Sequence, residues 1–301
     1  MKIIITGASG FVGSNLSDYL EKTDNQVLPV SMRSASWQNN LDQTADAIIH
    51  LAGKAHDTKS IAEEAEYFTV NTELTKELFE KFLASDIKDF IYFSSVKAVA
   101  DTVNDTLTED YKPDPKTPYG KSKLQAEEHL LSQNLPAEKR LFIIRPCMIH
   151  GPGNKGNLNL LYKVVEKGIP WPLASFENRR SFLSIDNLNF LILKILEDRT
   201  VASGIYNFAD DNSVSTNNLV EIIASGSGKP VRLWKIPQKF IQTVAKFGDT
   251  LPLPLNSEKL KKLTEDYLVS NAKIKQELNI KQLPLSAEEG LKITIESFKD
   301  S

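Results

Sequence analysis

The first half of the chain alternates short β-branched segments with amphipathic segments, and this alternation restricts the fold more than any other feature. KIIIT (2–6), for example, is followed by the helical pattern FVGSNLSDYLEK (11–22). Strands that alternate with helices form parallel sheets through right-handed crossovers, with helices on both faces. The predicted strands are 2–6, 26–31, 46–52, 89–95 and 140–146, and the predicted helices between them are 11–22, about 60–84 and 118–134. The sequence therefore predicts an α/β fold with a doubly wound parallel sheet.

The sequence changes character after Pro146. A glycine-rich loop, HGPGNKGN (150–157), leads into a region where prolines are frequent. Short helices are predicted there at about 158–167, 216–225, 238–247, 257–263 and 286–298. We expect residues 1–150 to form the sheet domain and residues 151–301 to form a smaller C-terminal lobe. Residues 184–210 are expected to return to the main sheet as a helix and a strand.

Composition and charge argue against several classes of function. The net charge is −3 and no run of lysine or arginine occurs, which argues against a nucleic-acid partner. The single cysteine, Cys147, excludes an internal disulfide, fits a reducing compartment and argues against a cysteine-based metal site, so no metal is expected. The N-terminal apolar run is too short for a signal peptide, and no later segment is long enough to span a bilayer. We therefore expect a cytoplasmic protein with no membrane partner.

The turn between the first strand and the first helix, ITGASGFVG, contains Gly7, Gly10 and Gly13. Glycine allows a tight turn, lets a pyrophosphate approach the backbone and lets the helix pack close to the strand. The helix N-terminus, with Phe11 and Val12 in its first turn, supplies N–H groups and a partial positive charge for the phosphates. A plain strand–helix turn is the competing interpretation. The spacing nevertheless favours a dinucleotide, and with it a sheet of the Rossmann type.

The end of the second strand predicts which dinucleotide binds. A carboxylate at this position accepts hydrogen bonds from the adenosine ribose of NAD. VLPVSMRS has no acid there and instead offers Ser31, Arg33 and Ser34. A guanidinium and hydroxyls suit a 2′-phosphate, so NADP is expected, with NAD still possible. In the alternative interpretation Arg33 is an ordinary loop charge.

The segment PYGKSK (118–123) places a lysine four residues after a tyrosine on a predicted helix. At about 100° per residue, one narrow arc of this helix holds Tyr119, Lys123, Ala126 and Leu130. The opposite side holds Lys121, Gln125 and Glu128. Burying a lysine on the apolar arc costs free energy unless its charge stabilises a nearby group. A phenol that must ionise is such a group, because the ammonium favours the phenolate. The pair is therefore a candidate for proton exchange with a hydroxyl or carbonyl, whereas the alternative is a lysine that only faces solvent.

The strand FIYFSS ends in Ser94 and Ser95. Hydroxyls at the carboxyl end of a central parallel strand lie where ligands bind in open α/β sheets. Capping of a turn is the alternative role for such a serine. The glycine turn, the serine at the strand end and the Tyr-x-x-x-Lys pair are far more specific together than separately.

With these features the sequence resembles the extended short-chain dehydrogenase/reductase family, in particular its nucleotide-sugar epimerases and reductases. The resemblance covers nearly the whole chain and depends on TGASGFVG, HLAG, FSSVKAV, PYGKSKLQAEEHL, IIRPCMIHGPG, RRSFLSIDNL and GIYNFAD. It implies that Ser95, Tyr119 and Lys123 form the catalytic set, that Tyr119 and Lys123 also contact the cofactor, and that Ser95 also contacts the substrate. Further cofactor contacts implied by the resemblance are Leu51, Ala52, Gly53, Pro146 and Met148.

The resemblance also implies a nucleotide-diphosphate sugar as substrate. Arg180 matches the family arginine that holds the diphosphate, and Asn157 resembles a further phosphate contact; an arginine fork suits phosphate. The alternative for Arg179 and Arg180 is a solvated charge patch. A homodimer is a further possibility.

The sequence departs from the family pattern in three places. Only about sixteen residues separate Ser31 from the next strand, so a truncated or absent helix is expected there. Val96 and Lys97 follow Ser95 where sugar dehydratases have an Asp-Glu pair, which argues against dehydration. Val99 and Ala100 replace a tyrosine-glycine pair that is common in the family, which leaves the substrate contact there undefined.

The resulting hypothesis is an NAD(P)-dependent oxidoreductase of polysaccharide biosynthesis that acts at C4 of a nucleotide-diphosphate sugar. Reduction of a 4-keto sugar with NADPH is favoured, because a reductase consumes hydride and must exchange its cofactor. A 4-epimerase that retains NAD(P) is the first alternative. A cofactor-sensing binding protein without catalysis is the second, although such proteins commonly lack the Tyr/Lys pair.

Overall fold

The computed structural model describes residues 1–34, 36–54, 63–154, 156–251 and 255–299. Its centre is a six-stranded sheet in the order β2-β1-β3-β4-β5-β8, in which every pair of neighbours is parallel. The strands are β1 (Lys2–Thr6), β2 (Gln26–Val30), β3 (Ala47–His50), β4 (Asp89–Phe93), β5 (Arg140–Pro146) and β8 (Gly204–Phe208). The strand order reverses at β1, so β1 and β3 flank the switch point where α/β sheets bind ligands. The predicted doubly wound sheet is confirmed.

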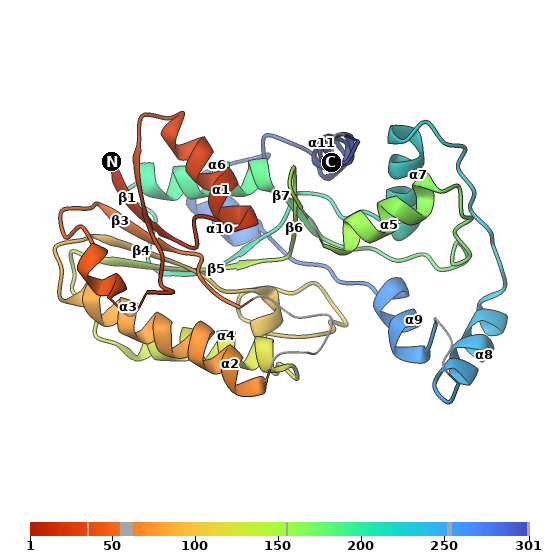
Figure 1. Cartoon of the computed structure of the whole chain (residues 1–301), viewed down its shortest axis with the longest axis horizontal. Helices are drawn as coiled ribbons and strands as arrows, with labels where there is room; N and C mark the ends of the chain where they lie inside the picture. The colour runs from red at the N-terminus through yellow and green to blue at the C-terminus, as the bar shows by residue number, and fades with distance from the viewer. Residues whose placement is uncertain (35, 55–62, 155, 252–254, 300–301) are drawn as a thin grey trace.

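Helices cover both faces of the sheet. α1 (Phe11–Glu21) and α6 (Ile185–Glu197) lie on one face, and α3 (Leu74–Leu83) and α4 (Pro118–Ser132) lie on the other (Figure 1). Alternate residues of β1 enter two separate cores, since Ile5 packs with the α1 and α6 side chains and Ile4 with those of α3 and α4. Burial on both faces explains why the central strands enclose unbroken apolar runs, whereas the edge strand β2 is only partly buried.

Two helical regions differ from a simple continuous pattern. The predicted helix 60–84 consists of α2 (Glu64–Phe68), a π-helical turn η2 (Thr69–Glu73) and α3, while residues 60–62 lie outside the described part. The π turn contains the fully buried Asn71, whose side chain bonds to backbone outside the helix. Between β2 and β3 the described residues form a single 3₁₀ turn, η1 (Trp37–Asn40), in place of a helix, as expected from the short spacing.

The C-terminal lobe has its own apolar core. Its helices are α5 (Asn157–Glu166), α7 (Thr216–Gly226), α8 (Gln238–Gly248), α9 (Ser257–Thr264) and α11 (Ala287–Ser297). A short parallel pair, β6 (Met148–His150) and β7 (Phe182–Ser184), joins the lobe to the sheet, and α10 (Ala272–Glu277) packs beside β8. The sequence did not indicate β6, β7 or α10, because each is only three to six residues long. Within the described residues, no helix combines the length and the apolar character needed to cross a bilayer.

Candidate active site

The glycine turn brings β1, α1 and the end of β3 into close backbone contact. Gly7 has φ +75°, and a Cβ on it would lie 2.7 Å from the backbone nitrogen of Ala52. A Cβ on Gly13 would lie 2.2 Å from the Gly7 carbonyl oxygen. Gly10 is the N-cap of α1, and the first turn of that helix has neither a side-chain cap nor an acidic residue. The N–H groups of this turn, which includes Phe11 and Val12, are therefore available to an anion.

The segment after β3 lies directly beside this turn. The backbone nitrogen of Leu51 donates to the Thr6 carbonyl at 3.1 Å, and that of Ala52 donates to the Thr6 hydroxyl at 3.2 Å. The Thr6 hydroxyl also bonds to the Nδ1 atom of His50 at 2.6 Å. Burial, reinforced by the charge of Lys123, lowers the pKa of His50 to about 3. A neutral imidazole therefore fixes the ends of β1 and β3 side by side.

Gly53, in the loop after β3, lies close to α4. A Cβ on Gly53 would lie 2.9 Å from Oδ1 of Asn71 and 3.3 Å from Nζ of Lys123. Asn71 accepts from the Lys54 backbone N–H at 2.7 Å and donates to the Ser122 hydroxyl at 3.0 Å. It thus ties the loop after β3 to α4. Sequence reasoning missed Asn71, although an asparagine inside a helical pattern was the available signal, because asparagine favours caps and turns over helix interiors.

The start of α4 is positioned by its own first residues. Thr117 is the N-cap, its hydroxyl accepts from the Gly120 backbone N–H at 3.2 Å, and Pro118 occupies the first turn. A Cβ on Gly120 would lie 2.3 Å from the Lys97 carbonyl oxygen. A glycine is therefore required for α4 to approach the turn that follows β4.

This approach brings Tyr119 to Ser95. Ser95 is the N-cap of η3 (Val96–Ala98), and its hydroxyl accepts from the Lys97 backbone N–H at 3.2 Å. Burial raises the pKa of Tyr119, a hydrogen bond with the Ser95 side chain lowers it, and the nearby Tyr67 phenol raises it. The Tyr67 ring meets the Tyr119 ring edge-on, with 6.3 Å between ring centroids. The hydrogen bond from Ser95 thus lowers the pKa of Tyr119 in this structure, whereas the sequence predicts that the Lys123 ammonium lowers it.

Lys123 is buried, while Lys121, Gln125 and Glu128 are exposed, as the predicted helix faces require. Its ammonium donates to the Phe93 carbonyl at 2.8 Å and lies 4.9 Å from the centroid of the Tyr92 ring. Burial lowers the pKa of Lys123 to about 8, against an opposing contribution from Glu127. The ammonium is thus held at the end of β4, between Gly53 and α4.

A buried ion pair behind Lys123 distinguishes the two serines at the end of β4. Glu127, one turn after Lys123 on α4, accepts from Arg145 of β5, with 2.5 Å between Oε2 and Nη2. The Ser94 hydroxyl donates to the same carboxylate. Ser94 is therefore engaged in the interior, and Ser95 is the serine that meets Tyr119. Neither Glu127 nor Arg145 was predicted, because a helical wheel does not show which strand residue a buried acid will meet.

Arg180 lies near the η3 turn that follows Ser95, on the side of the C-terminal lobe. Its Nη1 atom donates to the Lys262 carbonyl of α9 at 2.5 Å. Burial lowers the pKa of Arg180, while Glu265 and Tyr267 raise it. The Lys97 ammonium lies 4.4 Å from the centroid of the Tyr267 ring, and Arg180 is one of the groups that lower the pKa of Lys97. Two basic side chains, Arg180 and Lys97, thus lie near each other beyond Ser95.

The remaining predicted site residues lie on other elements. Ser31, Arg33 and Ser34 are exposed after β2, where the Ser34 and Ser36 hydroxyls are 3.1 Å apart. Pro146 ends β5 and is buried, whereas Met148 of β6 is partly buried against the lobe core. Asn157 begins α5, and its side chain lies outside the described part of the structure.

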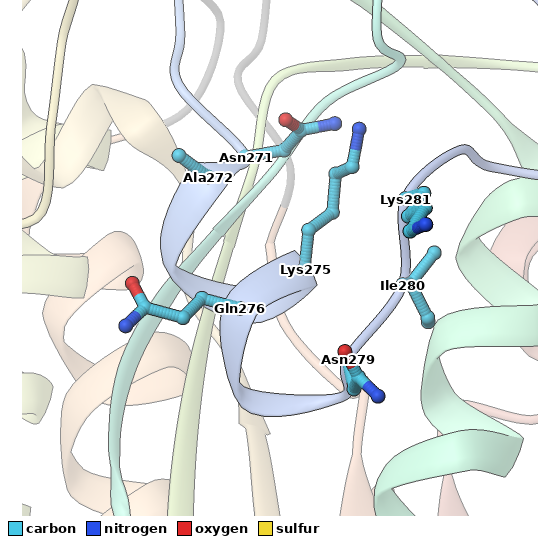
Figure 2. Close-up of a pocket in the computed structure, with 7 residues that line it drawn as sticks. All are labelled: Asn271, Ala272, Lys275, Gln276, Asn279, Ile280 and Lys281. Carbon is cyan, nitrogen blue, oxygen red and sulfur yellow. The ribbon is translucent and has the colours of Figure 1, made fainter.

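A separate cavity of about 400 Å³ lies away from these groups, beside α10 (Figure 2). It is lined by Asn271, Ala272, Lys275, Gln276, Asn279, Ile280 and Lys281. Its Lys275 is already paired with Asp211 at 2.6 Å, so this cavity does not compete as the catalytic centre. In the described ranges no group of three or more histidine, cysteine or acidic side chains is placed to hold a metal ion.

The described residues fit a dinucleotide. The Gly7–Gly13 turn leaves no room for a Cβ at two of its glycines, offers an uncapped helix N-terminus and lies at the switch point of the sheet. Leu51–Gly53 continues from this turn to Lys123, which lies one turn after Tyr119 on α4. A cofactor bound along this path would meet the Tyr/Lys pair at the end of β4.

The comparisons with known proteins agree with this arrangement. A family model described as the NAD dependent epimerase/dehydratase family matches residues 3–209. A UDP-glucose 4-epimerase from Vibrio cholerae is 31% identical over 318 residues, which cover 98% of this chain and 95% of that protein. An N-acetyl-alpha-D-glucosaminyl-diphospho-ditrans,octacis-undecaprenol 4-epimerase from Escherichia coli O157:H7 is 29% identical over 251 residues, or 78% of this chain and 75% of that protein.

A solved structure has the same fold. RMD from Pseudomonas aeruginosa, complexed with NADPH, superposes with a TM-score of 0.77 at 21% identity over 100% of this chain and 99% of that one. The family model spans more than half of the chain, and the Vibrio protein matches it from end to end. The chain therefore belongs to the NAD dependent epimerase/dehydratase family, a group of nicotinamide-dependent enzymes within the extended short-chain dehydrogenases/reductases.

Proposed function

We propose that this protein is an oxidoreductase that acts at C4 of a nucleotide-diphosphate sugar. The observation that carries the proposal is the hydrogen-bonded pair of Ser95 and Tyr119 beside the buried Lys123, at the end of β4. Donors and acceptors held in this way act on a carbonyl or alcohol oxygen that lies between them. The glycine turn and Leu51–Gly53 lead a dinucleotide to the same place.

Each member of the set has a distinct role in the proposal. Tyr119 exchanges the proton with the sugar oxygen, and Ser95 hydrogen-bonds to both the phenol and that oxygen. Lys123 holds positive charge beside the cofactor ribose and the phenol. The nicotinamide cofactor, when bound, supplies or accepts the hydride. The chain itself contributes orientation, proton transfer and electrostatics.

The direction favoured is reduction of a 4-keto sugar with NADPH. Burial raises the pKa of Tyr119, so the resting phenol is protonated and suited to donate a proton to a ketone oxygen. Arg33 and the Ser31 and Ser34 hydroxyls are exposed after β2, where a 2′-phosphate would need them. Arg180 and Lys97 supply positive charge for the substrate diphosphate. We further propose Asn157 as a phosphate contact.

Epimerisation at C4 is the second candidate, and one observation favours it. The Vibrio cholerae relative that matches almost the whole chain is a UDP-glucose 4-epimerase. Epimerisation and reduction use the same Ser95, Tyr119 and Lys123, so the catalytic set does not distinguish them.

One experiment separates the two reactions. The purified protein is incubated with UDP-sugars and no added cofactor while C4 stereochemistry is followed by NMR, and separately with a 4-keto nucleotide sugar and NADPH. Stoichiometric loss of NADPH absorbance with the keto sugar supports reduction. Many turnovers between two 4-epimers without added cofactor establish the epimerase instead. Arg33→Ala should reduce the preference for NADPH over NADH about tenfold or more, since hydrogen bonds to charged groups contribute about 1.5–3 kcal/mol.

A further inference from the structure

The tip of the C-terminal lobe exposes an unusual concentration of large apolar side chains. Exposed residues of this kind within 229–264 are Val231, Trp234, Phe240, Phe247, Leu251 and Leu263. Two of them are phenylalanines of α8, with exposed fractions of 61% and 60%. Figure 1 shows α8 and α9 at the end of the molecule opposite the sheet. We propose that this surface, the lobe tip, binds to the surface of an anionic lipid bilayer.

The apolar residues of α8 form a line rather than a scatter. Phe240, Val244 and Phe247 are separated by four and three positions, so they lie within about 60° of one another around the helix. Leu251 extends the line, because its backbone N–H still bonds to the Phe247 carbonyl at 2.9 Å. Lys239 and Lys246 lie on one side of this line and are exposed. An apolar stripe with lysines beside it is the pattern of helices that lie in a membrane interface.

The exposure of this line follows from how α8 is anchored. Its other face inserts Ile241 and Ala245 into the lobe core, leaving them 6% and 1% exposed. Gln238 donates to the Ser175 carbonyl at 2.7 Å at the start of the helix, and a Cβ on Gly248 would lie 1.9 Å from the Leu255 carbonyl oxygen. The helix therefore cannot rotate to bury its phenylalanines without giving up packed contacts.

The charge of the segment indicates the nature of its partner. Residues 229–264 contain eight lysines and arginines and two acids, a net charge of +6 in a chain whose total is −3. One acid, Glu258, is paired with Lys262 at 2.6 Å, and the other, Asp249, accepts from the Ser257 backbone and hydroxyl. Basic residues beside exposed aromatic side chains are attracted to anionic headgroups while the rings enter the acyl boundary.

Two other partners fit the lobe tip less well. A second copy docked about a two-fold axis would bring the same basic segments together, and like charges oppose such contact. Single-stranded nucleic acid binds aromatic rings that line a basic groove. Here the rings project from the outer face of a helix and are interleaved with the aliphatic Val244 and Leu251. The proposal does not depend on the proposed function, and it concerns attachment to a bilayer surface without any spanning helix.

Trp234 provides a direct probe. The chain has three tryptophans, of which Trp37 and Trp171 are buried and Trp234 is 56% exposed. Vesicles of phosphatidylglycerol and phosphatidylcholine should shift the emission of the full-length protein to the blue, and Trp234→Phe should remove the shift. The protein should also float with these vesicles on a density gradient, and pure phosphatidylcholine vesicles should retain at least about tenfold less of it, because several basic residues lose their anionic partners.

Matched variants test which residues are responsible. The Phe240→Ser/Phe247→Ser double variant and the Lys239→Glu/Lys246→Glu double variant should each lose flotation by about tenfold or more. The control is Leu131→Ser/Ile293→Ser, which removes two apolar side chains of 52% and 40% exposure elsewhere, and it should float like the wild type. Thermal melts verify that all three are folded.

Three results would overturn the proposal. The first is that the wild type shows neither the emission shift nor flotation. The second is that the phenylalanine variant floats unchanged. The third is that sedimentation shows self-association, or a fluorescent oligonucleotide shows binding, that the phenylalanine variant abolishes while vesicles have no effect.

Discussion

The proposed cofactor side and the proposed substrate side of the candidate site are built in different ways. On the cofactor side, backbone meets backbone: Gly7 approaches Ala52, Gly13 approaches the Gly7 carbonyl, and Gly120 approaches the Lys97 carbonyl. On the substrate side, side chains meet from distant segments, with Arg180 bonded to α9 and Lys97 stacked on Tyr267. The backbone contacts tolerate almost no residue other than glycine, whereas the side-chain contacts can be made by many different combinations of residues. This difference explains how relatives with one cofactor fold can act on different sugars.

The largest expected effect comes from removing Tyr119, which the proposed function places in contact with both sides. Tyr119→Phe should lower kcat by about 10²–10⁴-fold, the usual contribution of a positioned proton donor. Cofactor affinity, measured by fluorescence titration, should remain close to the wild-type value. Tyr162→Phe, in the lobe core, is the matched control and should keep kcat. Retention of wild-type kcat by Tyr119→Phe would remove the phenol from the mechanism.

The next effect tests whether the cofactor side depends on backbone contact. Gly7 and Gly168 both have positive φ, +75° and +70°, but a Cβ on Gly168 would meet nothing within 4 Å. Each Ala substitution should cost about 1–3 kcal/mol in free energy of unfolding for the strained backbone. Gly7→Ala should cost about 1–3 kcal/mol more through overpacking against Ala52, and should also weaken cofactor binding. Urea denaturation measures the free energy of unfolding of each variant. Equal losses in Gly7→Ala and Gly168→Ala would contradict the comparison.

A smaller effect is expected on the substrate side. Arg180→Lys should raise KM for the nucleotide sugar by about 10- to 100-fold, since a bidentate fork becomes a point charge and a charged hydrogen bond contributes about 1.5–3 kcal/mol. Cofactor affinity should not change. Arg179→Lys is the control, because that side chain is 66% exposed and pairs with Asp266 on the surface. A change in cofactor affinity without any change in KM would mean that Arg180 belongs to the other side.

The smallest effect, taken per pH unit, is a pH dependence of the buried His50. The folded-state pKa is about 3 and the ordinary value is 6.5, so the unfolded chain takes up a proton first as pH falls. The stability that the neutral ring contributes is present above about pH 6.5 and is lost toward pH 3, by at most about 1.4 kcal/mol per pH unit. His50→Gln should lose less free energy of unfolding between pH 7 and pH 5 than the wild type does. Parallel losses in both proteins would show that the ring is not the titrating group.

Much of the sheet was predictable because its strands are buried on both faces. KIIIT and RLFIIRP each enclose an unbroken run of apolar residues, and the observed strands match these segments to the residue. The π turn at η2 was not predictable, since it depends on where the Asn71 amide finds the Lys54 backbone. The same holds for the short pair β6 and β7, which tertiary pairing stabilises rather than any local pattern.

In the candidate site, too, local motifs were predictable from the sequence and contacts between distant segments were not. Spacing alone grouped Tyr119 with Lys123 and placed the glycine turn, because the two residues of the pair and the three glycines of the turn are each close together in sequence. Spacing did not show that Glu127 and Arg145 form an ion pair behind Lys123, or that Lys97 approaches Arg180. These contacts join residues far apart in sequence, so only the folded chain shows them. Under the proposed function, the choice of nucleotide and sugar depends on such contacts.

The position of β8 has a consequence for how this protein can be divided. The chain leaves the sheet after β5, builds β6, β7, α5 and α6, and then returns to pair β8 with β5 from Phe142 to Pro146. A gene fragment that ends near residue 150 would leave β5 as an open edge strand of apolar residues, which invites aggregation. Recombination that exchanges lobes between relatives would therefore have to cut at least three times, before α5, before α6 and after β8, rather than once. The two halves should therefore be expressed and engineered as a single unit.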